Sequence, residues 1–95
     1  MTYDELALSL EESAPPRGLS EPLRALWLAR KGDWDGAHRA ATDITNAIGS
    51  RIHAHLHRVE GDLSNARYWY RHAGAPEETG TLEAEWETLA RELTR

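Results

Sequence analysis

The chain has 95 residues, the size of one domain with a single modest hydrophobic core. Its 11 Lys and Arg residues against 16 Asp and Glu residues give a formal net charge of -5, which argues against nucleic acid as its main partner. The absence of Cys excludes disulfides, thiolate metal sites and cysteine nucleophiles, and it fits a reducing compartment.

The N-terminal segment predicts a helix over about residues 3–13. Thr2 and Glu5 have the spacing of a capping box, and Leu6 and Leu10 fall on one helical face. No long apolar run follows, so we expect neither a signal peptide nor a membrane span, and we expect a cytoplasmic protein.

Two helical hairpins are predicted in the middle of the chain, over about residues 20–48 and 50–74. Apolar residues recur at spacings of three or four along each expected helix, the pattern of an amphipathic helix packed against a neighbour. Gly49 is expected to break the chain between the hairpins, and Ser50 to cap the helix that follows. No segment alternates like a strand, and the sequence therefore predicts an all-α fold of five to six helices.

A final helix is expected over about residues 81–94, where Thr81 can cap an apolar stripe formed by Leu82, Trp86, Leu89 and Leu93. We expect this helix and the first one to cap the tandem hairpins within a single domain, residues 1–95. The acidic residues near the two ends are predicted to form solvated helix faces.

The two hairpins form an internal repeat, in which Gly61 follows Gly32 at an offset of 29 residues. Gly32-Asp33-Trp34-Asp35-Gly36-Ala37 aligns with Gly61-Asp62-Leu63-Ser64-Asn65-Ala66, and Ala25 with Ala54. Over about residues 22–74 this pattern resembles the tetratricopeptide repeat, in which a small residue precedes a Gly-Asp-aromatic turn and a second-helix Ala, although that family's period is longer. The chain also resembles a group of small bacterial hypothetical proteins, which implies no function.

One strip of polar residues is a candidate metal or catalytic site. His53, His57 and Glu60 are spaced so that they share one side of a helix, and two His four residues apart with a carboxylate one turn further can hold a divalent metal ion. His38 or His72 can supply a further ligand if the hairpins pack favourably. The alternative is structural, because the strip borders an apolar face where a His commonly bonds to a neighbouring helix.

The leading functional expectation is a non-enzymatic interaction module that binds a protein or peptide between its hairpins, since stacked hairpins form a concave surface. The polar residues expected to contact this partner are His55, Arg58, Tyr68 and Arg71. A small metal-binding or enzymatic domain that uses the polar strip is the alternative, and no other cofactor is expected. No nucleophile triad or phosphate loop is present, so no catalytic residue is assigned. A second copy of the chain is a further candidate partner, because an array of hairpins leaves ends that need covering.

Overall fold

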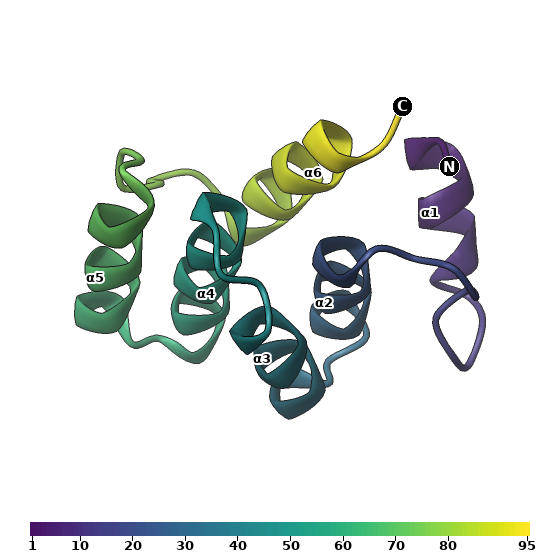
Figure 1. Cartoon of the computed structure of the whole chain (residues 1–95), viewed down its shortest axis with the longest axis horizontal. Coiled ribbons are helices and arrows are strands. Elements are labelled where there is room, and N and C mark those ends of the chain that lie inside the picture. The colour runs from purple at the N-terminus through teal and green to yellow at the C-terminus, as the bar shows by residue number, and fades with distance from the viewer.

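Six α-helices and no strand make up the computed structural model, which describes residues 1–95. The helices are α1 (Tyr3–Ser9), α2 (Glu21–Arg30), α3 (Trp34–Thr42), α4 (Ala47–Glu60), α5 (Leu63–Ala73) and α6 (Leu82–Leu93). The hairpins α2–α3 and α4–α5 follow one another, with α1 beyond α2 and with α6 returning to α2 and α4 (Figure 1). The predicted all-α fold of tandem hairpins with flanking helices is confirmed. Even the longest helix, with 14 residues, is too short and too polar to cross a membrane.

The two hairpins turn at equivalent Gly-Asp pairs. Gly32 and Gly61 have φ angles of 86° and 85°, a left-handed conformation that favours glycine at the end of a helix. The side chains of Asp33 and Asp62 then cap the next helix by accepting a hydrogen bond from the backbone N–H three residues further on. The sequence repeat is therefore also a repeat of backbone geometry.

The first helix is shorter than the expected range of 3–13. After Ser9, the backbone N–H groups of Leu10, Glu11 and Glu12 donate to carbonyls three residues back, so the chain tightens into turns. Extension of the helix is also opposed by the adjacent negative charges of Glu11 and Glu12, which would lie at its negative end.

The break between the hairpins comes earlier than predicted, at residues 43–46. Asn46 caps α4 by accepting a hydrogen bond from the backbone N–H of Gly49, so Gly49 and Ser50 lie inside this helix and not between the hairpins. A Cβ atom on Gly49 would lie 2.1 Å from the carbonyl oxygen of Ile44. Glycine is therefore needed here for a close contact between the connection and α4, and it does not end a helix.

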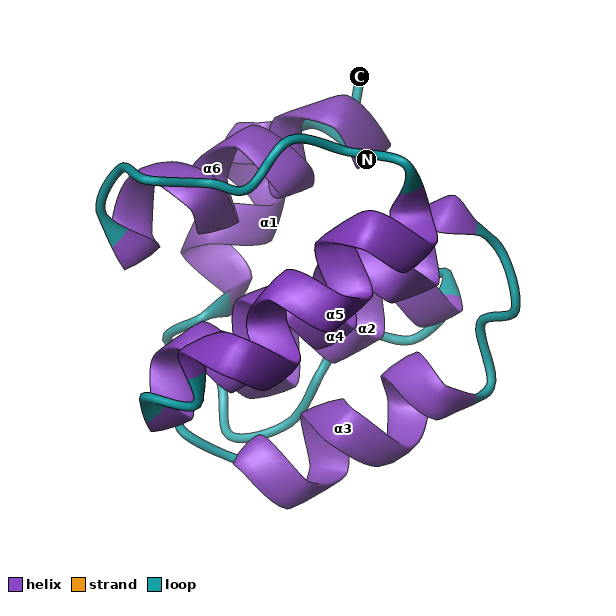
Figure 2. Cartoon of the chain, turned by 90° about the vertical axis from the view of Figure 1, so that its left-hand side faces the viewer, coloured by secondary structure: helices purple, strands orange, loops and turns teal.

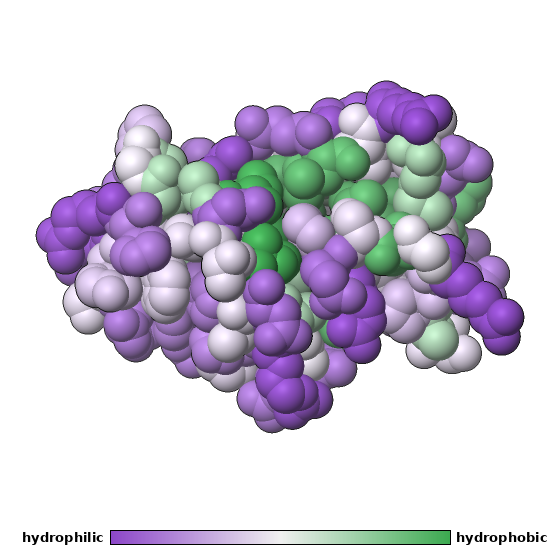
Figure 3. Space-filling view, in the orientation of Figure 1, coloured by the Kyte–Doolittle hydropathy of each residue, from purple (hydrophilic) through white to green (hydrophobic).

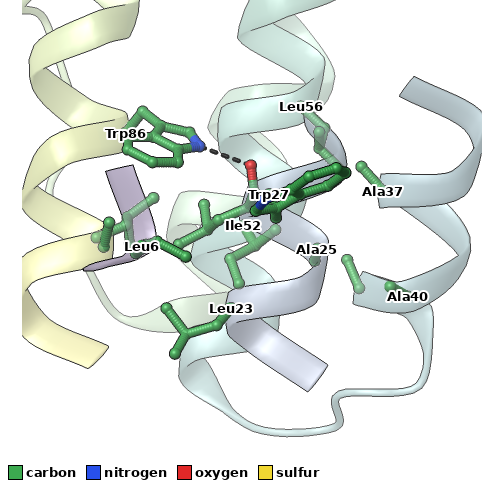
Figure 4. Close-up of a cluster of buried hydrophobic side chains, with 13 residues drawn as sticks. Leu6, Leu23, Ala25, Trp27, Ala37, Ala40, Ile52, Leu56 and Trp86 are labelled. Atoms are coloured by element: carbon green, nitrogen blue, oxygen red, sulfur yellow. Dashed lines mark hydrogen bonds between the residues drawn. The ribbon is translucent and has the colours of Figure 1, made fainter. Parts of the chain in front are cut away.

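The main core lies where α2, α3, α4 and α6 meet, and α1 closes one end of it with Leu6 (Figure 4). The indole N–H of Trp86 donates to the carbonyl oxygen of Leu26 at 2.7 Å, which fastens α6 to the first hairpin. The chain ends meet, because the backbone N–H of Arg95 donates to the carbonyl of Met1 at 3.1 Å (Figure 1). In Figure 3, apolar side chains gather where α6 lies beside α2 and α4.

Helix α4 is surrounded by other helices. Seen from the α5 side, α5, α4 and α2 lie one behind another, with α3 on one side and α6 on the other (Figure 2). All side chains from Ile52 to His57 are consequently buried. Both sides of α4 therefore lie inside over this stretch, because different neighbours cover the apolar residues and the two histidines of the strip, His53 and His57.

Candidate metal centre

Three histidines from two helices converge between α3 and α4. His38 lies on α3, and His53 and His57 lie one turn apart on α4. One ring nitrogen from each lies within 4.8 Å of the other two. A tetrahedral zinc ion with Zn–N bonds of about 2.0–2.1 Å needs its nitrogens about 3.3 Å apart, so small side-chain rotations would complete such a site.

The ring of His38 is positioned by Trp34, one turn earlier on α3. The two rings are stacked, with centroids 4.8 Å apart and planes inclined by 10°. The indole N–H of Trp34 donates to the carbonyl oxygen of Leu56 at 2.9 Å, and this bond anchors α3 to α4. The Trp34 indole thereby holds the His38 ring toward the two histidines of α4.

The ring of His53 is positioned by Trp69 on α5, at a centroid distance of 4.1 Å and an interplanar angle of 12°. His53 is only 5% exposed, and its Nδ1 is buried without a hydrogen-bond partner. Burial lowers the pKa of His53 to about 4, and the neighbouring His38 and His57 add to this shift. The ring is therefore neutral at neutral pH, the form in which imidazole binds a metal ion.

The ring of His57 is held by a carboxylate. Its Nδ1 lies 2.6 Å from Oε1 of Glu60, one turn further along α4. A carboxylate that holds one nitrogen of a histidine fixes the ring and leaves the other nitrogen free, an arrangement common among metal-binding histidines. In this geometry Nε2 is the nitrogen of His57 that is available to a ligand.

The candidate ligands in the structure therefore differ from the predicted set of His53, His57 and Glu60. His53 and His57 do lie together, and His38 joins them. Glu60 forms a separate group with His57 and Asp62, so it does not share a site with His53. The sequence placed all three residues on one side of the helix, but Glu60 is the last residue of α4 and its carboxylate contacts the ring of His57.

A cavity of about 430 Å³ lies against the three histidines. Its wall is formed by His38, Thr42, Ile44, Thr45, Ser50, His53, His57, Trp69 and His72. His72, the other conditional ligand, lies on this wall but outside the histidine cluster, and its Nδ1 is 3.0 Å from the hydroxyl oxygen of Ser50. The cluster therefore faces a space large enough for a small molecule.

A second polar cluster surrounds Glu85 of α6, which is 6% exposed. Its Oε1 accepts one hydrogen bond from Nη1 of Arg58 and pairs with Nδ1 of His55, both at 2.7 Å. The hydroxyl of Tyr70 donates a hydrogen bond to Oε2. Burial acts to raise the pKa of Glu85, but the hydrogen bonds from His55, Tyr70 and Arg58 outweigh it, and the pKa is lowered. Burial and the bond to Glu85 raise the pKa of Tyr70.

This second cluster corrects the expectation that His55 contacts a partner, because His55 is only 3% exposed and its ring is paired with Glu85. Arg58 also bonds to Glu85, but its side chain is only partly buried, and its contact with a partner stays a prediction. Tyr68 and Arg71 are exposed on α5, so their contact with a partner stays a prediction. The prediction that the acidic residues of the last helix form a solvated face is wrong for Glu85. Its position indicates burial, because it lies three residues after Leu82, within the apolar stripe of α6.

Comparison with known proteins found no family, no curated protein and no solved structure similar to this chain. The functional interpretation therefore depends on the side chains of the chain itself.

Proposed function

We propose that this protein is a small helical metal-binding domain, and that His38, His53 and His57 bind one divalent transition-metal ion. Zn²⁺ is the ion that fits best, because imidazole nitrogen is among its preferred ligands and it accepts three protein nitrogens in tetrahedral geometry. The proposal is carried by the convergence of one ring nitrogen from each of three histidines, one of which, His53, also has a buried Nδ1 without a hydrogen-bond partner.

An unpartnered buried nitrogen is costly in a purely structural histidine cluster. Leaving a buried polar group unsatisfied costs about 1–3 kcal/mol, and replacing it with an apolar group of similar shape avoids that cost. Coordination of a metal ion through this nitrogen of His53 would supply the missing partner. The neutral state of His53 also means that no proton has to be displaced at neutral pH.

Each of the three histidine rings is also held in its orientation by a neighbouring side chain, as is common for metal ligands. Each contacts a different positioning group: Trp34 for His38, Trp69 for His53 and Glu60 for His57. Support of this kind limits how far the rings must move when the ion binds. Three neutral ligands leave one tetrahedral position open, and the adjacent cavity gives that position room.

Titration of tag-free protein with Zn²⁺, followed by calorimetry, tests the proposal directly. We expect one ion per chain, and at a free zinc concentration about 100 times Kd the unfolding free energy rises by about 2.7 kcal/mol. For a domain of this size that corresponds to a rise in Tm of about 10 °C or more. Titration with Co²⁺ should give the visible absorption of a four-coordinate ion. The absence of a saturable one-to-one event for both ions would refute the proposal.

Single substitutions can show whether the ion binds at the three histidines or at the neighbouring group of His57, Glu60 and Asp62. His38→Gln and His53→Gln should each weaken zinc binding by at least about 100-fold, and Glu60→Gln, which removes a positioning group, by about 10–100-fold. Asp62→Asn is the matched control, because it removes a carboxylate beside His57 while keeping a residue that can cap α5. Equal losses in Asp62→Asn and His38→Gln, each folded by circular dichroism, would place the ion elsewhere and overturn the assignment.

A further inference from the structure

The cavity beside the histidine cluster has an unusual charge composition. The chain carries 16 acidic residues and a formal net charge of -5, yet neither Asp nor Glu forms part of the cavity wall. The three histidines are neutral ligands, and the Glu60 carboxylate contacts His57 at Nδ1 and does not line the cavity, so a bound divalent ion would have no anionic ligand from the chain. The space next to the ion would thus lie beside a positive charge that Glu60 offsets only through His57, and no carboxylate of the chain lines it.

We propose that the metal-loaded protein binds a small organic carboxylate in this cavity, with the carboxylate group in the open coordination position. This inference rests on the proposed function, because the metal ion supplies the positive charge. A zinc ion with three protein ligands ordinarily takes water or an added ligand in the fourth position. An anion from solution would supply the negatively charged ligand that the cavity wall lacks.

Polar groups on the wall can fix the orientation of such a ligand. Ser50 is 4% exposed and pairs with Nδ1 of His72, so the opposite nitrogen of that ring is left for another contact. With the Ser50 hydroxyl as donor, Nε2 of His72 carries the proton and can donate it to a carboxylate oxygen. The hydroxyl of Thr42, in contrast, is already engaged with the carbonyl of His38 at 2.8 Å.

The rest of the wall favours a ligand with a hydrocarbon part. The Trp69 ring and the Ile44 side chain both line the cavity. A volume of about 430 Å³ is far more than a water molecule or a simple inorganic anion needs. The chemistry that these walls recognise is therefore a short-chain monocarboxylate, with its charged end on the metal and its carbon chain against Trp69 and Ile44.

The test uses Co²⁺-loaded full-length protein, whose visible absorption reports a change in the ligands of the ion. Acetate, butyrate and butyramide are titrated in turn. Butyrate should alter the spectrum saturably and bind about tenfold more tightly than acetate, because two more methylene groups are buried. Butyramide has the same shape without the charge, and it should leave the spectrum unchanged.

His72→Phe provides the matched variant, because it keeps a planar ring and removes the donor. It should keep the cobalt affinity of the wild type and weaken butyrate binding by about 3- to 10-fold, through loss of one hydrogen bond. If Co²⁺ does not bind at all, the proposed function fails and this inference with it. If Co²⁺ binds but butyrate and butyramide act alike, or if His72→Phe binds butyrate as tightly as the wild type, the metal site stands and the carboxylate inference is refuted.

Discussion

Substitution of Glu85 by Ala is expected to destabilise the fold severely, although Glu85 lies in a strongly acidic helix. Its carboxylate is 6% exposed and bonds to His55, Arg58 and Tyr70. Glu85→Ala leaves the Arg58 guanidinium, whose side chain is 12% exposed, without its counter-charge. Removing one partner of a buried ion pair costs about 3–5 kcal/mol.

The expected loss is a large fraction of the total stability. A domain of this length has an unfolding free energy of about 5–14 kcal/mol. Urea denaturation followed by circular dichroism measures the change, and the midpoint should fall while the slope stays constant. Glu85→Gln keeps the shape of the side chain and can still accept hydrogen bonds, so its loss should be smaller, about 1–3 kcal/mol.

Glu83→Ala is the matched control, because Glu83 lies in the same first turn of α6 but is exposed. Both substitutions remove a negative charge near the positive end of the helix, so that contribution cancels in the comparison. Glu83→Ala should change stability by no more than about 0.5 kcal/mol. If Glu85→Ala lowers the unfolding free energy by less than about 1 kcal/mol, or by no more than Glu83→Ala does, the bonds of Glu85 do not hold α6 against α4 and α5.

Three further predictions follow from the same structure. The pKa of Glu85 is lowered in the folded state, so ionised Glu85 stabilises the fold above the ordinary pKa of the carboxyl group. This stabilisation is lost as the pH falls through the pKa of the folded state. The difference in unfolding free energy between wild type and Glu85→Gln, measured by urea titrations between about pH 7 and 3, should therefore shrink at acid pH. Gly49→Ala should lower the unfolding free energy, measured by urea denaturation, by about 1–3 kcal/mol, because the new Cβ would lie 2.1 Å from a carbonyl oxygen. Gly80→Ala should be tolerated, because its Cβ would meet only a flexible side chain. Equal stability of both glycine variants would contradict the close contact. Tyr70→Phe should lower the unfolding free energy by about 1–3 kcal/mol and Tyr68→Phe should hardly change it, because of these two residues only Tyr70 donates to a buried carboxylate. Similar melting temperatures for the two variants would contradict the hydrogen bond from Tyr70 to Glu85.

The helices and their turns could be predicted from the sequence because the signals are local. A capping side chain bonds to a backbone N–H three residues away, and a left-handed glycine ends a helix within one turn. Thr2 and Thr81 therefore cap helices as expected, and Gly32 and Gly61 end them. Signals of this kind require no knowledge of neighbouring helices.

Local signals also misled where a tertiary contact competed with them. Gly49 and Ser50 look like a break and a cap, but Asn46 caps the helix and Gly49 allows the close approach of Ile44. Glu85 looks like one more solvated acid on α6. Its burial depends on Arg58 and on other residues that are distant in the sequence, and a single helix cannot reveal them.

The sequence by itself determined the hairpins, their repeat and the presence of His53 and His57 on one side of α4. Only the tertiary structure decided which residues join them, because packing of α3 against α4 brings in His38, and α5 adds Trp69 and the cavity wall. The same packing turned His55 toward α6 and left Glu60 beside the cluster instead of within it. The physical reason is that helix formation depends on residues up to about four positions apart, whereas a site between helices depends on how their side chains pack across long separations in sequence.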